Sequence, residues 1–155
     1  MIQRIQSVYL FLTTVLSILF LSGSFLSFIN KSGDVYKIGF TDIVRITQGQ
    51  TPEIIGKIFP LTIIVILIAA LSLITIFLFK KRMIQLLLSG ILIGIISVLI
   101  LVSFYYTYSV ISKYDATMEP GIKMALPFLQ LIFSILAFRG IKKDDKLVKS
   151  YDRLR

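Results

Sequence analysis

The chain has 155 residues, of which 56% are hydrophobic and 16% are charged, and its formal net charge is +9. A water-soluble domain of this size could not bury so much apolar surface, so the composition favours one integral membrane domain over residues 1–155. There is no Cys, which excludes disulfides and thiolate chemistry, and no His, which removes the commonest metal ligand and general base.

The first predicted membrane span covers residues 8–28, which carry no charge. A helix of this length is about 31 Å long, which matches a bilayer hydrocarbon core of about 30 Å. The same stretch resembles a cleaved signal peptide, with Arg4 before the apolar run and small residues at Ser22–Ser24. Because apolar residues continue past those small residues to Ile29, a retained helix is the preferred interpretation.

Residues 30–57 are the long polar segment and are predicted to lie outside the membrane. Asn30–Asp34 is a turn signal, and the runs on either side of it, Ser24–Ile29 and Val35–Phe40, favour a small β-hairpin at the membrane surface. Residues 41–53 are expected to form a short helix followed by a helix start.

The second and third predicted spans are residues 58–79 and 83–108. Each is long enough to cross the bilayer, and the third ends in a cluster of aromatic residues typical of the lipid headgroup level. The basic residues Lys80, Lys81 and Arg82 lie between the two spans and are expected to form a tight turn.

The fourth predicted span covers residues 121–141 and is the weakest. Its uncharged stretch, 124–138, is only about 22 Å of helix, so Lys123 and Arg139 must extend their charged ends toward the two membrane surfaces. A re-entrant segment is the alternative. The tail, residues 142–155, is predicted to be an amphipathic helix on the membrane surface.

The basic residues are unevenly distributed if the chain crosses four times with both ends on one side. That side carries a net charge of +8 and the opposite side +1. Since short loops rich in Lys and Arg stay in the cytoplasm, both termini are predicted to be cytoplasmic, and a re-entrant segment is disfavoured because it would export the basic tail. Contact with anionic lipid, rather than nucleic acid, is expected from the residues on this side: Arg4, Lys80, Lys81, Arg82, Arg139, Lys142 and Lys143.

Few residues carry a pattern typical of chemistry. Gln130, an amide within the fourth span, is expected to form a helix–helix hydrogen bond. Asp115 and Glu119 are four residues apart, which is the spacing of a carboxylate pair, although two solvated loop carboxylates are commoner. The sequence has no phosphate-binding loop, dinucleotide motif or metal-ligand cluster, so no cofactor, metal or enzymatic activity is expected.

Gly90, Gly94 and Ser97 recur at a spacing that places them on one helix face. Small residues let two helices approach closely, so this face is predicted to pack inside the monomer or to form the seam of a homo-oligomer.

The two ends of the chain are more distinctive than the spans. The motifs Met1–Leu10 (MIQRIQSVYL) and Lys143–Arg155 (KDDKLVKSYDRLR) resemble the domain-of-unknown-function 4293 family, small integral membrane proteins of Bacteroidota. The resemblance covers the whole chain and implies four helices and an inner-membrane location, without catalytic residues. Because both motifs fall on the predicted cytoplasmic side, we expect them to meet there through a few residues: Gln3, Arg4, Gln6, Asp152 and Arg153.

Together these patterns predict an all-α membrane protein, a four-transmembrane-helix bundle with a small extracytoplasmic β-hairpin and a cytoplasmic amphipathic C-terminal helix. The leading functional hypothesis is a non-catalytic accessory subunit that contacts a larger membrane complex or itself. One alternative is a small transporter or channel subunit that oligomerises through Gly90 and Gly94. Another is a lipid-acting membrane enzyme that uses Asp115 and Glu119 beside Tyr105.

Overall fold

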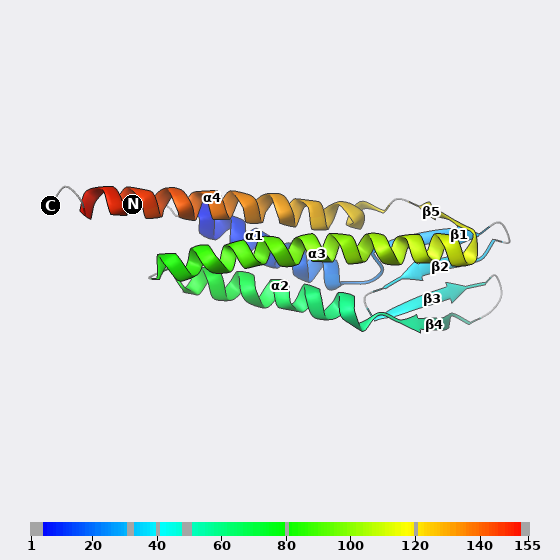
Figure 1. The fold of residues 1–155 in the computed structure, drawn as a ribbon. Helices are drawn as coiled ribbons and strands as arrows, with labels where there is room; N and C mark the ends of the chain where they lie inside the picture. The colour runs from blue at the N-terminus through cyan, green and yellow to red at the C-terminus, as the bar shows by residue number, and fades with distance from the viewer. Residues whose placement is uncertain are drawn as a thin grey trace.

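In the computed structural model, the described residues are 5–30, 33–39, 41–47, 51–79, 81–119 and 121–152, with residues 122 and 147–152 described by their backbone only. Within them, four helices lie side by side and a five-stranded antiparallel sheet stands at one end (Figure 1). In chain order the elements are α1 (Ile5–Leu21), β1 (Leu26–Asn30), β2 (Val35–Ile38), β3 (Asp42–Ile46), β4 (Glu53–Lys57), α2 (Phe59–Phe77), α3 (Arg82–Tyr114), β5 (Ala116–Glu119), the 3₁₀ helix η1 (Ile122–Ala125) and α4 (Leu126–Asp152).

The predicted fold class, an all-α four-transmembrane-helix bundle with a small hairpin, was wrong. The described residues include a five-stranded sheet, and three helical segments among them are long and apolar enough to cross a membrane: α2, α3 and Lys123–Lys146 of η1 and α4. α1 is apolar but has only 17 residues, about 25 Å of helix, which falls short of a hydrocarbon core of about 30 Å. The three long apolar helices are those of a membrane protein, and its fold combines helices with a sheet.

The expected and observed element boundaries differ most at the first and last helices. The first span was expected to cover residues 8–28, but α1 ends at Leu21 and the chain turns at Gly23, whose φ of +76° suits glycine. The tail, residues 142–155, was expected to be a separate surface helix. As far as Asp152, it instead continues α4 without a break.

The sheet has the strand order β4-β3-β2-β1-β5, and all neighbouring strands are antiparallel. The predicted hairpin is present as β1 and β2, with Leu26 opposite Ile38. Where the structure describes residues 41–53, it has strands in place of the expected short helix and helix start, and residues 48–50 lie outside the described residues. The described part contains β3 and the beginning of β4. β-branched residues make up most of β3 and the centre of β4, and such residues favour a pleated surface.

A fifth strand joins the two polar parts of the chain. β5 follows α3 and pairs with β1, so that Phe28 lies opposite Met118 although 90 residues separate them in the sequence. The segment after α3, expected to be a plain loop, is therefore part of the same sheet.

α3 connects the helices to the sheet. Its 33 residues are about 50 Å long, roughly 20 Å more than a hydrocarbon core requires. Near its end Val110 is buried, and the ring of Tyr114 stacks on that of Tyr36 in β2 with 4.6 Å between ring centroids. The last turns of α3 therefore support one face of the sheet.

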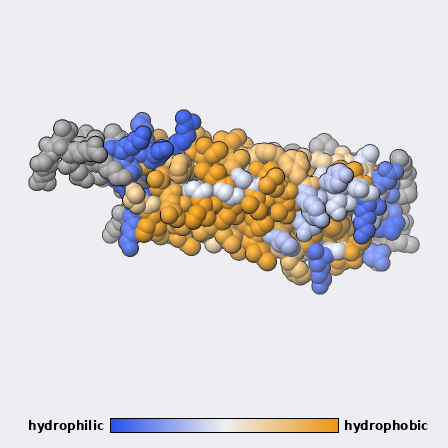
Figure 2. Space-filling view, viewed as in Figure 1, coloured by the Kyte–Doolittle hydropathy of each residue, from blue (hydrophilic) through white to orange (hydrophobic). Residues whose placement is uncertain are grey.

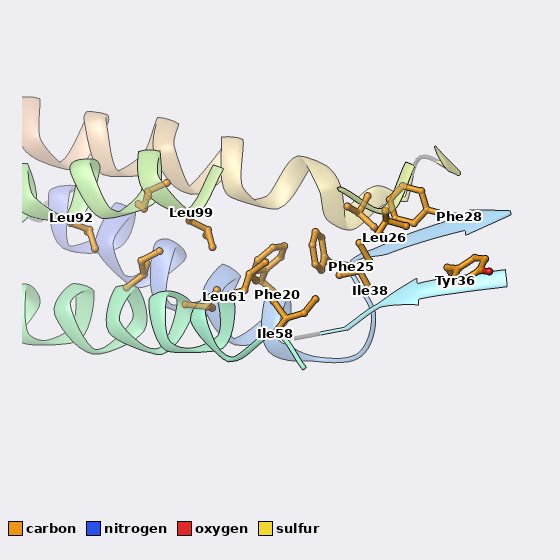
Figure 3. Packing of buried hydrophobic residues seen from close by; sticks show 14 of the residues in the cluster. Phe20, Phe25, Leu26, Phe28, Tyr36, Ile38, Ile58, Leu61, Leu92 and Leu99 are labelled. Atoms are coloured by element: carbon orange, nitrogen blue, oxygen red, sulfur yellow. The ribbon is translucent and has the colours of Figure 1, made fainter. Parts of the chain in front are cut away.

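One hydrophobic core continues from the helices into the sheet. Phe20, Leu61 and Leu99 fill the space between helices, and Phe25 and Ile38 extend the same cluster to the base of the sheet (Figure 3). Because the core is shared, the sheet and the helices form one packed unit.

The outside of the helices is apolar as well. Figure 2 shows a broad hydrophobic band over the helices, with hydrophilic residues gathered at both ends. Large side chains of these helices are exposed, for example Leu101 of α3 at 68% and Phe77 of α2 at 75%. An exposed apolar belt of this extent is expected of a surface that faces lipid.

Candidate functional site

Three helices meet through polar groups at the end away from the sheet. Gln6 of α1 donates a hydrogen bond from Nε2 to Oδ2 of Asp144 on α4, at 2.8 Å. Arg82, the first residue of α3, donates from Nη1 to the backbone oxygen of Asp144 at 3.0 Å. We call Gln6, Arg82, Gly140 and Asp144 the inner junction. It ties the start of α1 and the start of α3 to the same turn of α4.

Gly140 completes the inner junction because it leaves room for α1. A Cβ atom at this position would lie 3.1 Å from Oε1 and 3.3 Å from Cβ of Gln6, and 4.0 Å from its Cα. Contacts below 3.4 Å require the neighbour to move, so glycine is what permits the close approach of α4 to Gln6.

The inner junction can be compared with the expected contact between the two end motifs of the chain. Gln6 does reach α4, but it binds Asp144, about two turns before Asp152. Gln3, Arg4 and Arg153 lie outside the described residues, and Asp152 is described by its backbone only. Sequence reasoning missed Gly140 and Asp144, although a glycine beside Arg139 in a helical segment was a usable signal.

A second group of polar side chains links α1 to its neighbours farther along the helices. The Thr14 and Ser72 hydroxyl oxygens lie 2.7 Å apart and join α1 to α2. Gln130 Nε2 donates to Ser17 Oγ at 3.3 Å and joins α4 to α1, which is the helix–helix bond expected of this amide. Buried polar contacts therefore join α1 to both α2 and α4.

Gln130 is only partly satisfied by this bond. Its Oε1 and the Oγ of Ser134 are buried and have no hydrogen-bond partner among the described residues. A buried acceptor without a partner costs about 1–3 kcal/mol, whereas an interhelical hydrogen bond within a membrane contributes about 0.6 kcal/mol on average. The bond to Ser17 therefore does not offset the free-energy cost of burying Gln130 Oε1 without a partner.

Gln130→Leu is accordingly expected to leave the free energy of unfolding unchanged or to raise it by about 1 kcal/mol. Ser17 keeps its own bond to the Thr13 backbone oxygen in this variant. The measurement is an unfolding titration in mixed detergent micelles, followed by circular dichroism. A loss of more than about 2 kcal/mol would show that Gln130 Oε1 has a partner that stabilises the protein.

The other end of α1 is held by a lysine. The Lys123 ammonium group donates a hydrogen bond to the backbone oxygen of Ser22, just past the last turn of α1. A positive charge at this end complements the helix dipole, and Gly23 leaves room for the ammonium group. Lys123 was expected only to reach the membrane surface, and its link to α1 was not foreseen.

The sheet contains its own ion pair. The Asp34 side chain is 7% exposed. Its Oδ2 accepts two hydrogen bonds from Arg45, one from Nε at 3.0 Å and one from Nη2. The guanidinium of Arg45 lowers the pKa of the Asp34 carboxyl, with a smaller contribution from Thr47. Arg45 also lies over the Tyr36 ring, 5.9 Å from its centroid, so the pair holds β3 against β2 and the turn before it.

The lowered pKa of Asp34 makes this end of the sheet sensitive to acid. A carboxylate with a depressed native pKa stabilises the fold above its ordinary value of 3.8, and this contribution is lost as pH falls through the lower native pKa. We expect the hydrogen-exchange protection factors of β2 and β3 amides to fall below about pH 4. In Asp34→Asn this acid-induced step should be absent, and an unchanged step would assign it to another carboxyl.

The small residues Gly90, Gly94 and Ser97 all lie on the exposed side of α3. A Cβ atom at Gly94 would meet nothing within 4 Å, and one at Gly90 would make ordinary contact, 3.7 Å, with Phe138. The geometry therefore gives little support to packing inside the monomer. A seam between copies stays a prediction.

The basic residues gather around the inner junction. Lys81, Arg139, Lys142 and Lys143 are exposed there, and Arg82 is partly exposed because it binds Asp144. Lys80 lies outside the described residues. The hydrophilic surface at this end of the helices is visible in Figure 2.

The carboxylate pair proposed for a lipid-acting enzyme falls on two elements. Asp115 directly follows α3 and has the left-handed conformation, with φ of +46°, and Glu119 is the last residue of β5. A hollow beside Tyr105 is lined by Tyr108 and Lys113, among others, and neither carboxylate is among its described lining residues. The described residues contain no group of three or more acidic side chains that could hold a metal ion.

Comparison with known proteins returns one family. The model of the family described as "Domain of unknown function (DUF4293)" matches residues 2–154. No curated protein matches the chain.

Proposed function

Since the chain belongs to the domain-of-unknown-function 4293 family, whose description names no activity, we propose a function from its architecture. We propose a non-catalytic accessory protein of the bacterial inner membrane that holds its five-stranded sheet at the outer surface, where a larger membrane complex docks on it. α2, α3 and α4 cross the bilayer in this proposal, and the shorter α1 packs beside α2 and α4 between the inner junction and the sheet.

The orientation follows from charge. α1 begins and α4 ends at the end of the helices away from the sheet (Figure 1). The exposed basic residues Lys81, Arg139, Lys142 and Lys143 lie at that same end, and the positive-inside rule places it in the cytoplasm. These residues then contact anionic headgroups, which contribute about 1 kcal/mol per basic residue near the surface.

The observation that carries the proposal is the continuity of α3. This helix runs unbroken from Arg82 at the inner junction to Tyr114, which stacks against the sheet. A sheet mounted in this way keeps a fixed height and direction relative to the membrane. Such preorganisation lowers the entropy cost of binding, which suits a docking platform.

The proposal is tested by the native mass of the protein after gentle detergent extraction. We expect it to migrate well above the monomer mass, together with other membrane proteins in a fixed ratio. Recovery as a monomer or as a homo-oligomer alone, under conditions that preserve other membrane complexes, would contradict the accessory role.

A second candidate, a transporter or channel subunit formed by oligomerisation, is favoured by one observation. Gly94 and its small neighbours are exposed on α3, where another copy could approach closely. The same measurement separates the candidates, because this one requires a homo-oligomer whose mass falls to that of the monomer in Gly94→Leu.

A further inference from the structure

Two helices that begin level at the inner junction end at different heights on the side of the sheet. Gln6 of α1 and Arg82 of α3 both bind Asp144, which holds the inner ends of the two helices at one level. From Gln6 to Ser22, just past the end of α1, is about 24 Å of helix. From Arg82 to Phe104 is about 33 Å, and α3 continues beside the strands where α1 has already ended (Figure 1).

The sheet-side end of α1 has charged side chains on both of its flanks. On the α4 side, the Lys123 ammonium group binds the backbone oxygen of Ser22. On the α2 side, a hollow of about 570 Å³ opens directly beyond Leu21. Its lining includes residues of the turn after α1, of the sheet and of α2: Leu21, Gly23, Ser24, Lys37, Asp42 and Thr62. Because charged side chains are costly to place in hydrocarbon, the hydrocarbon beside α1 ends near the level of Ser22.

The exposed surface of α3 stays apolar above that level. Val98 lies about 24 Å from the start of α3, at the height of Ser22, and is 48% exposed. Leu101 and Phe104 follow on the exposed side of the helix, and the exposed Tyr105 ring comes next. Since tyrosine rings favour the headgroup level, the hydrocarbon on this side reaches at least as far as Phe104.

α1 and α3 occupy opposite corners of the helix bundle, because each of them packs against both α2 and α4. The apolar wall of the molecule is therefore about 9 Å shorter at the α1 corner than at the α3 corner. Tilting the whole bundle does not remove this difference. It would level the ends beside the sheet only by separating the inner ends by the same height.

A helix shorter than the hydrocarbon is accommodated by long flanking side chains that extend to the membrane surface, by association with another helix, or by a thinner bilayer. Lys123 is the long cationic side chain at this end of α1, and its ammonium group is bound at Ser22. The hollow beyond Leu21 already offers a charged and hydroxyl-lined surface at the same level, which suits lipid headgroups. These two observations favour the thinner bilayer.

We propose that the sheet-side leaflet of the bilayer is drawn down beside α1, by about 9 Å relative to its height beside α3, so that phospholipid headgroups fill the hollow beyond Leu21. Lys37, which is exposed in this hollow, pairs with their phosphate groups. The acyl chains below contact exposed apolar side chains of α1, such as Ile18. The α1 corner is thus a surface that deforms lipid, and this inference does not depend on the accessory role.

The test uses the full chain in nanodiscs that hold one copy each, with a single nitroxide spin label. The chain has no cysteine, so Ser22→Cys and Val98→Cys place the label at two exposed positions of equal height. In oleoyl phospholipid, we expect a water-soluble nickel chelate to relax the label at residue 22 about tenfold more than the label at residue 98, because hydrocarbon excludes the chelate. Equal relaxation of the two labels would mean a flat leaflet and would overturn the proposal.

A change of acyl-chain length provides the second readout. In shorter myristoleoyl phospholipid, the label at residue 98 should become accessible to the chelate, whereas the label at residue 22 should change less than about twofold, because the leaflet beside α1 is already thin. A parallel gain at both positions would contradict local thinning. Protection of residue 22 in native membranes, with exposure in nanodiscs, would also overturn the proposal, since it would mean that another protein covers α1.

The native-mass measurement separates this inference from the proposed function. A protein that is recovered as a monomer but shows the difference between the two labels would contradict the accessory role and support the thinned leaflet. A stable complex whose two labels are equally accessible in nanodiscs would do the reverse.

Discussion

Gly140→Leu is expected to separate α1 from α4 at the inner junction. A Cβ alone would lie 3.1 Å from Oε1 and 3.3 Å from Cβ of Gln6, and a leucine adds three further carbons to that space. Overpacking of this kind costs about 1–3 kcal/mol, and displacement of Gln6 also removes its bond to Asp144. We expect a loss of at least 2 kcal/mol, or roughly thirtyfold in the folding equilibrium, measured by unfolding titration in mixed micelles.

Gly94→Leu is the matched control for this prediction. It makes the same change in a helical glycine, but a Cβ there meets nothing within 4 Å. In protein shown to be monomeric, the control should unfold at the same or slightly higher detergent concentration as the unaltered protein, because leucine is a better helix former than glycine. Equal effects of the two substitutions would mean that α1 does not approach α4 as the structure shows.

Ser109→Pro is expected to release the sheet from the helices. Residue 109 is exposed in the last third of α3, and a proline in a helix interior costs about 3 kcal/mol or more through a lost hydrogen bond and a steric clash. The resulting kink moves Tyr114 away from Tyr36, whose rings now stack at 4.6 Å. We expect at least tenfold faster hydrogen exchange in β1 and β2 and a loss of near-ultraviolet tyrosine dichroism.

Ser109→Ala provides the control, because it keeps the helix and removes the same hydroxyl. Exchange in the sheet should then match that of the unaltered protein. If Ser109→Pro also left sheet exchange unchanged, the sheet would be stable without the end of α3, and the rigid mounting inferred from that helix would be wrong.

Part of the fold follows directly from local patterns in the sequence. The turn signal at Asn30–Asp34 and the two runs beside it predicted the β1–β2 hairpin, because turn chemistry and alternation act over a few residues. The long apolar runs of α2 and α3 were equally visible, since a run without charge is a property of composition.

The rest of the sheet could not be predicted in this way. β3 and β4 mix charged residues with isoleucine and valine, and that pattern fits a short helix as well as an edge of a sheet. β5 becomes a strand only because β1 is there to pair with it, and 90 residues separate Phe28 from its partner Met118. Such non-local pairing leaves no local signature in the sequence.

The polar contacts of α1 were also predictable only in part from the sequence. The N-terminal motif was identified as distinctive, and Gln6 was expected to meet the other end of the chain. Its partner Asp144 depends on the register between α1 and α4, which is set by the space at Gly140. The length of α1 was overestimated because the apolar residues of β1 extend its hydropathy, although they belong to the core of the sheet.

The central claim, that the sheet stands outside the membrane and the inner junction in the cytoplasm, is tested most directly by cysteine labelling. The chain has no cysteine of its own, so a variant with one introduced cysteine has a single labelling site. Lys37→Cys places it at an exposed position of β2, and Lys142→Cys at an exposed position of α4. In intact spheroplasts treated with a membrane-impermeant maleimide, residue 37 should be labelled at once and residue 142 only after the membrane is opened. Labelling of residue 142 from outside, with residue 37 protected, would contradict the account.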